Sequence, residues 1–149
     1  MILLLSMNSI FVNSWTKCRY AFADFILQQE IEYAMNRIVD DARIAYKIDL
    51  SDNKLRFYQH IMPTFNELQN RDKSKPWYKL KDKRIYHNGE SSPITGGNAL
   101  SGITIRKFEY YQKNNHPKLL CIKMEAESSI THHKITLSTE VFMRGYNGE

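Results

Sequence analysis

The chain has 149 residues, of which 42% are hydrophobic and 25% are charged; this balance is typical of one folded domain and excludes a disordered chain or a multi-span membrane protein. The two cysteines, Cys18 and Cys121, are too few for a disulfide framework or a zinc site of four cysteines. The formal net charge of +5 is local, because residues 71–84 carry seven basic and two acidic side chains while the remainder carries 14 of each.

The first residues form an apolar run. Residues 1–12 read MILLLSMNSIFV, interrupted by three polar residues, and Trp15, Lys17 and Arg19 follow. A membrane-spanning helix needs about 20 largely apolar residues, so this run is about half of one. A tryptophan followed by cations is typical of the membrane boundary. A secretory signal peptide fits less well, because it needs a basic segment before the apolar run and a small-residue cleavage site after it.

A helical pattern continues beyond this boundary. No Gly or Pro interrupts residues 1–50, so we expect one helix over residues 1–48, about 65–70 Å long at about 1.5 Å per residue. The alternative is two helices, the second running from about residue 24 to 47 and started by a capping residue such as Asn13 or Asp24. One helical face is apolar, with spacings of three and four: Leu27, Ile31, Met35, Ile38, Ala42 and Ala45.

Residues 49–149 alternate with the two-residue period of half-buried strands. The order of one helix followed by strands predicts an α+β fold with an antiparallel sheet, covered by the second half of the helix. We expect a hairpin turning at Asp82 and Lys83, pairing of the last two strands, and a long mobile loop over residues 88–102. The expected strands include residues 55–61, 78–80, 85–86, 103–111, 120–126 and 135–143.

Several segments together resemble the minor pseudopilins of type II secretion, particularly the J-type subunit, and the minor pilins of type IV pilus assembly. The helix has Met35, Ile38, Asp41 and Arg43 at the family's spacing. The likeness continues through the hairpin YKLKDKRIYHNG, the loop from Pro93 to the strand ITIRKFEYY, and the close HKITLSTEVFMRGYN.

The resemblance implies a pilin-like fold and a structural role without enzymatic activity, cofactor, metal or small-molecule substrate. It implies a single-pass helix in the cytoplasmic (inner) membrane, an extracytoplasmic globular domain, and other minor and major pilins or pseudopilins as partners at the filament or its tip. It does not distinguish a secretion, pilus or competence machine. The family's basic leader, Gly-Phe cleavage site and early glutamate are not in the sequence, so we expect Met1 to correspond to the middle of a longer helix.

The second half of the helix carries charged residues at spacings of three and four, where they can pair with one another on a solvated face. In a filament, some of them would instead contact neighbouring subunits, where complementary charge fixes register. The candidates for subunit contacts are Glu30, Arg37, Asp41 and Arg43. No catalytic or nucleotide-binding motif is found, and His132 and His133 are expected in a solvated turn rather than a metal site.

The basic segment 71–84 interleaves cations with aromatic rings, a pattern that suits phosphates and stacked bases. Its candidate nucleic-acid contacts are Lys75, Trp77, Lys79, Lys81 and Lys83. The interpretation we favour at this point is a solvated lysine-rich strand and its loop, for which protection of a sheet edge is one role. DNA binding by a minor pilin is the less favoured alternative.

A second alternative is a soluble α+β protein with a ligand pocket beneath the helix. It would need convergent polar residues, and the candidates are Asp24, Tyr33, His60 and Tyr110. A short helix folded over a deep pocket would favour this function, whereas a continuous helix that projects from the sheet would argue against it.

Overall fold

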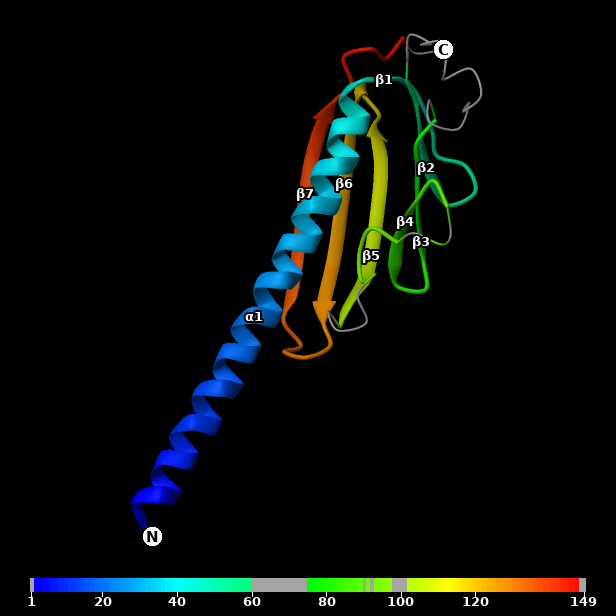
Figure 1. Cartoon of the computed structure of the whole chain (residues 1–149). Helices are drawn as coiled ribbons and strands as arrows, with labels where there is room; N and C mark the ends of the chain where they lie inside the picture. Colours follow the sequence, from blue (N-terminus) through cyan, green and yellow to red (C-terminus); the bar gives the residue numbers. More distant parts are fainter. Residues whose placement is uncertain (1, 60–74, 90, 92, 98–101, 148–149) are drawn as a thin grey trace, which may run out of the picture.

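The computed structural model describes residues 2–59, 75–89, 91, 93–97 and 102–147, with side chains from residue 7 onward. Within these residues one helix comes first and seven strands follow, in two antiparallel sheets (Figure 1). The predicted α+β order is therefore confirmed. The sequence pattern predicted one sheet, however, and did not predict the division into two.

Helix α1 (Ile2–Arg43) is continuous over 42 residues. The single long helix is confirmed and the two-helix alternative is wrong. The predicted helix end at residue 48 is also wrong, because Ala45–Asp49 forms strand β1. Backbone hydrogen bonds from the C-terminal segment hold this transition: Arg144 N donates to Arg43 O at 3.2 Å, and Asn147 N donates to Tyr46 O at 3.2 Å.

The two halves of α1 have different surroundings. From Ala23 onward an apolar stripe packs into the core, and Leu27, Ile31 and Ile38 have no exposed surface. Before Ala23 the helix extends past the end of the three-stranded sheet (Figure 1), and its described side chains are almost all exposed. The predicted apolar face is thus confirmed for the second half of the helix. Ala45 is buried as well, but in β1.

The first sheet has the order β1-β2-β3-β4. Besides β1 it contains β2 (Lys54–Gln59), β3 (Trp77–Lys81) and β4 (Arg84–His87). The predicted hairpin of β3 and β4 is confirmed. Asp82 and Lys83 form its two-residue turn with φ angles of 49° and 60°, and this left-handed conformation at both positions matches the twist of a hairpin. Ile61 lies outside the described residues.

The second sheet has the order β5-β6-β7, with β5 (Ile103–Lys113), β6 (His116–Ser128) and β7 (Lys134–Phe142). The predicted pairing of the last two strands is confirmed by the register that joins Leu120 to Val141 and Ala126 to Ile135. Helix α1 lies along β6 and β7 (Figure 1). The two sheets meet where Ile105 N donates to Lys83 O at 2.8 Å.

Both sheets and α1 share one hydrophobic core. The inner side of the first sheet contributes Leu55, Phe57, Tyr78 and Ile85, all without exposed surface. The loop after β4 closes the core at residues 93–97. Ile94 N donates to Ile85 O at 2.7 Å, and the buried Thr95 hydroxyl accepts from Ile85 N at 3.0 Å. This part of the loop, expected to be mobile, is therefore anchored to β4.

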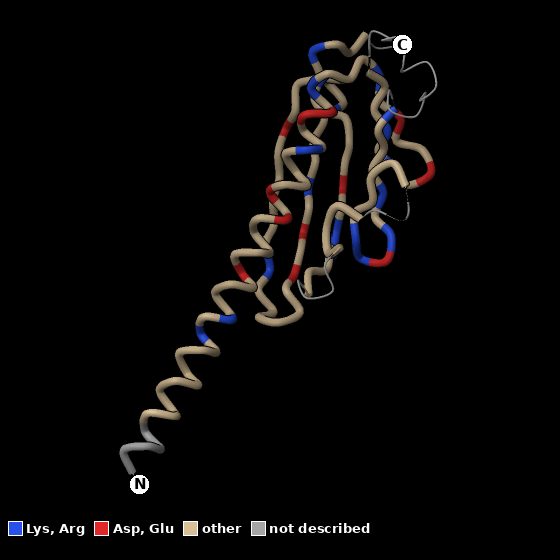
Figure 2. Tube along the Cα trace, in the orientation of Figure 1, with Lys and Arg blue, Asp and Glu red and all other residues tan. Residues whose placement is uncertain are grey.

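Charged residues are distributed differently on the two sheets (Figure 2). On the second sheet, four basic side chains each pair with a glutamate at 2.8–3.2 Å. Strands β1 to β4 instead contain six basic residues and one acidic residue, Asp49. The local excess of charge in residues 71–84 therefore extends across the first sheet.

Candidate functional site

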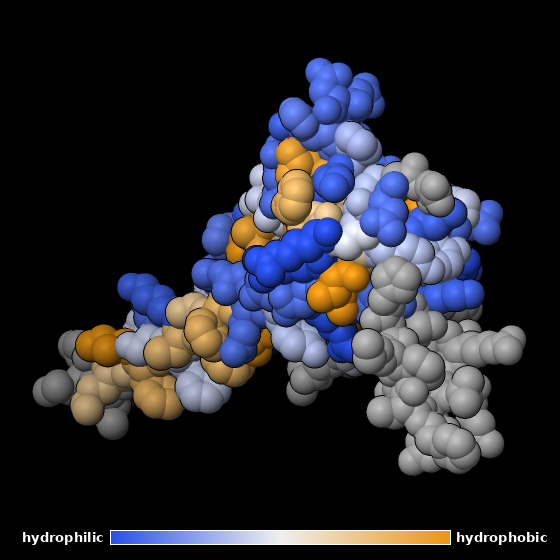
Figure 3. All heavy atoms as spheres, turned by 90° about the horizontal axis from the view of Figure 1, so that it is seen from above, coloured by the Kyte–Doolittle hydropathy of each residue, from blue (hydrophilic) through white to orange (hydrophobic). Residues whose placement is uncertain are grey.

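Residues 7–22 of α1, the projecting arm, expose large apolar side chains. In Figure 3 tan and orange spheres gather on the arm where it leaves the domain. A contiguous apolar surface of this kind marks a contact with another protein or with a membrane. Its large apolar side chains are each at least 48% exposed: Met7, Ile10, Phe11, Val12, Trp15, Tyr20 and Phe22.

Part of this apolar surface forms a regular stripe, the outer seam of α1. Phe22 and Ile31 are nine residues apart, about two and a half turns at about 3.6 residues per turn, so they lie on opposite sides of the helix. The seam therefore faces away from the chain's own domain. It advances by steps of four, four, three, four and three through Met7, Phe11, Trp15, Cys18, Phe22 and Phe25, all exposed.

All four predicted subunit contacts make interactions within the chain, and the first three reach residues outside the helix. Glu30 Oε2 accepts a hydrogen bond from Gly96 N at 2.8 Å, which ties the anchored loop to the helix. Arg37 donates to Tyr33 Oη at 3.3 Å and contacts His87 Nδ1 at 3.2 Å. Arg43 remains exposed and pairs only with Asp40, at 3.4 Å, among the described residues. A role for these four residues between subunits stays a prediction.

Asp41 is the centre of a polar network between α1 and the first sheet. Its carboxylate accepts hydrogen bonds from the Tyr78 hydroxyl at 2.5 Å and from Gln59 Nε2 at 3.2 Å, and His87 Nε2 lies 3.9 Å away. Burial and the hydrogen bond to Asp41 raise the pKa of Tyr78 well above its usual range. The phenol therefore stays protonated and joins β3 to the helix.

His87 belongs to the same network in its neutral form. Burial, and then the charge of Arg37, lower the pKa of His87, although Asp41 acts in the opposite direction. An Arg37 guanidinium that donates to Nδ1 assigns the imidazole proton to Nε2, on the side of Asp41. The network thus holds α1 against β2, β3 and β4. This structural role accounts for the polar side chains at this position.

A second polar contact holds α1 where the arm begins. Asp24 accepts a hydrogen bond from the Thr131 hydroxyl at 2.5 Å and lies 3.4 Å from His133 Nδ1. His132 contacts a different carboxylate, Glu127, at 3.7 Å. The turn between β6 and β7 is therefore hydrogen-bonded to the helix. Among the described residues no group of three or more His, Cys, Asp or Glu side chains could hold a metal ion.

The basic segment lies on the first sheet. Trp77, Lys79 and Lys81 alternate with the inward-facing Tyr78 and Leu80 along β3, and they share its outer side. Lys83 is exposed in the hairpin turn, and Lys75 is exposed just before β3. Strand β3 lies between β2 and β4, so edge protection by Lys79 and Lys81 is wrong. The exposed Lys75 and Lys83 agree with the solvated loop of the favoured interpretation. Residues 71–74 lie outside the described residues.

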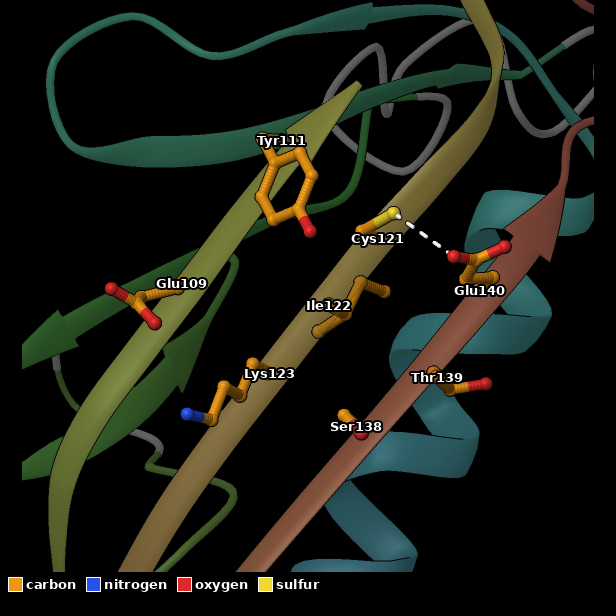
Figure 4. Close-up of a pocket in the computed structure, with 8 residues that line it drawn as sticks. All are labelled: Glu109, Tyr111, Cys121, Ile122, Lys123, Ser138, Thr139 and Glu140. Carbon is orange, nitrogen blue, oxygen red and sulfur yellow. Dashed lines mark hydrogen bonds between the residues drawn. The ribbon is translucent and has the colours of Figure 1, made fainter. Parts of the chain in front are cut away.

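A shallow depression of about 370 Å³ lies on the second sheet. Figure 4 shows its residues arriving from β5, β6 and β7. The Cys121 thiol lies 3.8 Å from Glu140, whose carboxylate also pairs with Lys113 at 3.2 Å. The thiol and the Lys113 ammonium group thus share one carboxylate. Cys18 and Cys121 are both free thiols.

The polar residues considered for a ligand pocket do not converge. Asp24 contacts the β6–β7 turn, and Tyr33 is 57% exposed beside Arg37. Tyr110 is half-buried next to Phe108, with ring centroids 5.1 Å apart. His60 lies outside the described residues. The described candidates therefore occupy separate places and define no common binding site.

Among the described residues, α1 included, no helix combines the length and the apolar character that crossing a membrane requires. Comparison with known proteins does not assign the chain to a family. No family model matches the chain, and neither a curated protein nor a solved structure matches it.

Proposed function

We propose that this chain is a minor pseudopilin or minor pilin, a structural subunit that helps to initiate or assemble a type II secretion pseudopilus or a type IV pilus, including a competence pilus. In this proposal the front of α1 anchors the subunit as a single pass in the cytoplasmic membrane and then packs among the helices of other minor and major subunits. The sheets form a pilin-like extracytoplasmic domain at the filament or its tip. The role is assembly, without catalysis.

The outer seam of α1 is the observation that carries this proposal. Packing between the helices of two subunits requires an apolar stripe with steps of three and four residues on a side that the subunit's own domain leaves uncovered. The outer seam has both properties. Burying one of its large side chains fully against a partner contributes about 1.5–3 kcal/mol. Association with a partner would therefore be favoured by removing the outer seam from water.

The course of α1 also separates this proposal from the ligand-pocket alternative. A pocket protein of the kind considered needs a short helix folded over a cavity. Helix α1 is instead continuous over 42 residues and extends past the sheet (Figure 1). This geometry, together with the resemblance of the helix and hairpin sequences to minor pseudopilins, favours a filament subunit.

The proposal can be tested by cell fractionation and cross-linking of the full chain, expressed in its native cells. We expect the protein in the membrane fraction, and we expect a thiol-specific cross-linker to capture neighbouring subunits through Cys18, since Cys18 is exposed and Cys121 is buried. Mass spectrometry of the captured proteins should find long apolar N-terminal helices that begin after a cleaved Gly-Phe site. The variant Phe11→Asp, Trp15→Asp, Phe22→Asp should lose both membrane retention and cross-linking.

The matched control introduces three aspartates at exposed polar positions of the same helix, Gln28→Asp, Gln29→Asp and Asn36→Asp. It should behave as the unmodified chain. A chain that stays in the soluble fraction, or cross-linked partners without a prepilin-type helix, would contradict the proposal. Equal loss in both triple variants would show that added charge, rather than the outer seam, causes the effect.

A further inference from the structure

The outer side of the four-stranded sheet, here the basic face, concentrates positive charge. In an antiparallel pair, residues directly opposite each other point to the same side of the sheet. The register places Lys54 opposite Lys79, and Lys81 opposite Arg84. The cations of the basic face are Lys47, Lys54, Arg56, Lys79, Lys81 and Arg84.

The four strands themselves contribute little negative charge to this face. Asp49 is the one acidic residue in β1 to β4, and its carboxylate lies 4.0 Å from Arg56. On the other sheet of the same chain, Arg106, Lys107 and Lys123 each pair with a glutamate at 2.8–3.0 Å. The basic face therefore presents a positive field that a polyanion can neutralise. The interior position of β3 removes edge protection as an explanation for Lys79 and Lys81.

Aromatic rings lie among these cations. Lys54 Nζ lies 4.9 Å from the centroid of the Trp77 ring, and Lys75 Nζ lies 5.6 Å from that of Tyr58. Trp77 and Tyr58 are half-buried, so each ring is supported by the sheet. Their π faces can be reached by a flat ligand, because a lysine ammonium group already lies over each of them. A nucleobase can take the place of the ammonium group over Trp77 while that group moves to a phosphate.

From this geometry we infer that the basic face binds single-stranded nucleic acid, with its cations on the phosphates and Trp77 stacked against a base. A positively charged surface with stacking rings is how proteins hold single strands without reading sequence. A duplex would use the cations alone, because its bases are stacked inside it. The inference goes beyond the proposed role in filament assembly and does not depend on it.

Fluorescence anisotropy with a labelled oligothymidylate tests the inference. The probe should have about 20 nucleotides, longer than the about 4–16 that one binding module covers, and the full chain should be kept in a neutral detergent because its arm is apolar. Replacing Lys47, Lys54 and Lys79 of the basic face, together with Lys75 beside Tyr58, by Gln should weaken binding about tenfold or more. The slope of log K against log salt should fall by about 0.7 for each phosphate that the variant no longer neutralises.

The matched control removes four positive charges from the other sheet, by Gln at Arg106, Lys107, Lys113 and Lys123. It should bind as the unmodified chain does, and circular dichroism should show that both variants are folded. Unchanged binding in the first variant would overturn the inference. Equal weakening in both variants would also overturn it, because the effect would then follow net charge alone.

Trp77 separates a single strand from other polyanions. Trp77→Ala should weaken oligothymidylate binding about 5- to 150-fold, the usual effect of losing one base stack, while Trp77→Phe retains a ring and should lose less. Neither variant should alter the weaker binding of a duplex of the same length. If Trp77→Ala left oligothymidylate binding unchanged, a single strand would be excluded as the ligand. The same conclusion would follow if the unmodified chain bound the duplex as tightly as the oligothymidylate.

Discussion

Replacing Tyr78 by Phe measures how strongly the polar network joins α1 to the first sheet. The substitution removes only a hydroxyl that donates to Asp41 at 2.5 Å, and it keeps a ring that lies edge-on to Phe57 at 6.0 Å. A hydrogen bond to a charged group contributes about 1.5–3 kcal/mol. Because the Asp41 side chain is 24% exposed, water replaces part of the missing bond, and we expect a loss of about 1–2 kcal/mol.

Urea denaturation of the full chain in neutral detergent, followed by circular dichroism, measures this loss. Tyr33→Phe is the matched control, because it removes a hydroxyl on an exposed ring that accepts from Arg37 at 3.3 Å. It should change the free energy of unfolding by less than about 0.5 kcal/mol. In a double-mutant cycle, Tyr78→Phe and Asp41→Ala should couple by about 1–2 kcal/mol. Equal effects of the two Tyr→Phe variants would refute the reasoning.

The pH dependence gives the same prediction a second measurement. The pKa of Tyr78 is raised in the folded state, so its contribution to stability is present below the unfolded value of about 10. The contribution is lost as the pH rises towards the folded pKa, because the unfolded chain then releases a proton that the folded chain retains. The stability difference between the unmodified chain and Tyr78→Phe should therefore shrink above pH of about 10. A difference that grew with pH would contradict this sign.

Two further outcomes follow from the backbone and from the network. Gly102→Ala should destabilise the fold by about 1–3 kcal/mol, because Gly102 has a φ angle of 59° and an added methyl group would collide with Ser129 Oγ; Gly89→Ala, with no atom within 4 Å, is the control in the same denaturation assay. Acidification below about pH 6.5 should lower stability, because burial lowers the pKa of His87 and the unfolded chain then binds a proton that the folded chain does not. A His87→Gln variant should show a shallower loss, and an identical pH profile would count against the assignment.

The core elements were predictable because their signals are local. The apolar stripe of α1 repeats at helical spacing, and β6 and β7 alternate with a period of two. Strand β1 was missed because Ala45 continues the helical spacing, while the hydrogen bonds that make it a strand come from β2 and from Asn147, far along the chain. Local periodicity cannot register such partners.

The site residues show the same limit. Glu30, Arg37 and Asp41 were recognised by helical spacing as charges able to meet other subunits, but their hydrogen-bond partners lie 66, 50 and 37 residues away. The sequence indicated part of the basic face through segment 71–84. Lys54 could be assigned to this face only from the register of β2 with β3. The outer seam did have a sequence signal, the steps of four and three from Met7 to Phe25, which the apolar run at the start of the chain obscured.

The alignment of α1 with β6 and β7 has a mechanical consequence. A tensile load along the helix axis would act on the buried stripe and on the Asp24–Thr131 contact in shear, because the helix lies alongside the strands (Figure 1). In shear, many contacts bear the force at once, whereas in peeling they fail one after another. Resistance to forced unfolding depends on the barrier that must be crossed, and simultaneous failure raises that barrier. A pull transmitted through the helix would therefore reach the domain along its strongest direction.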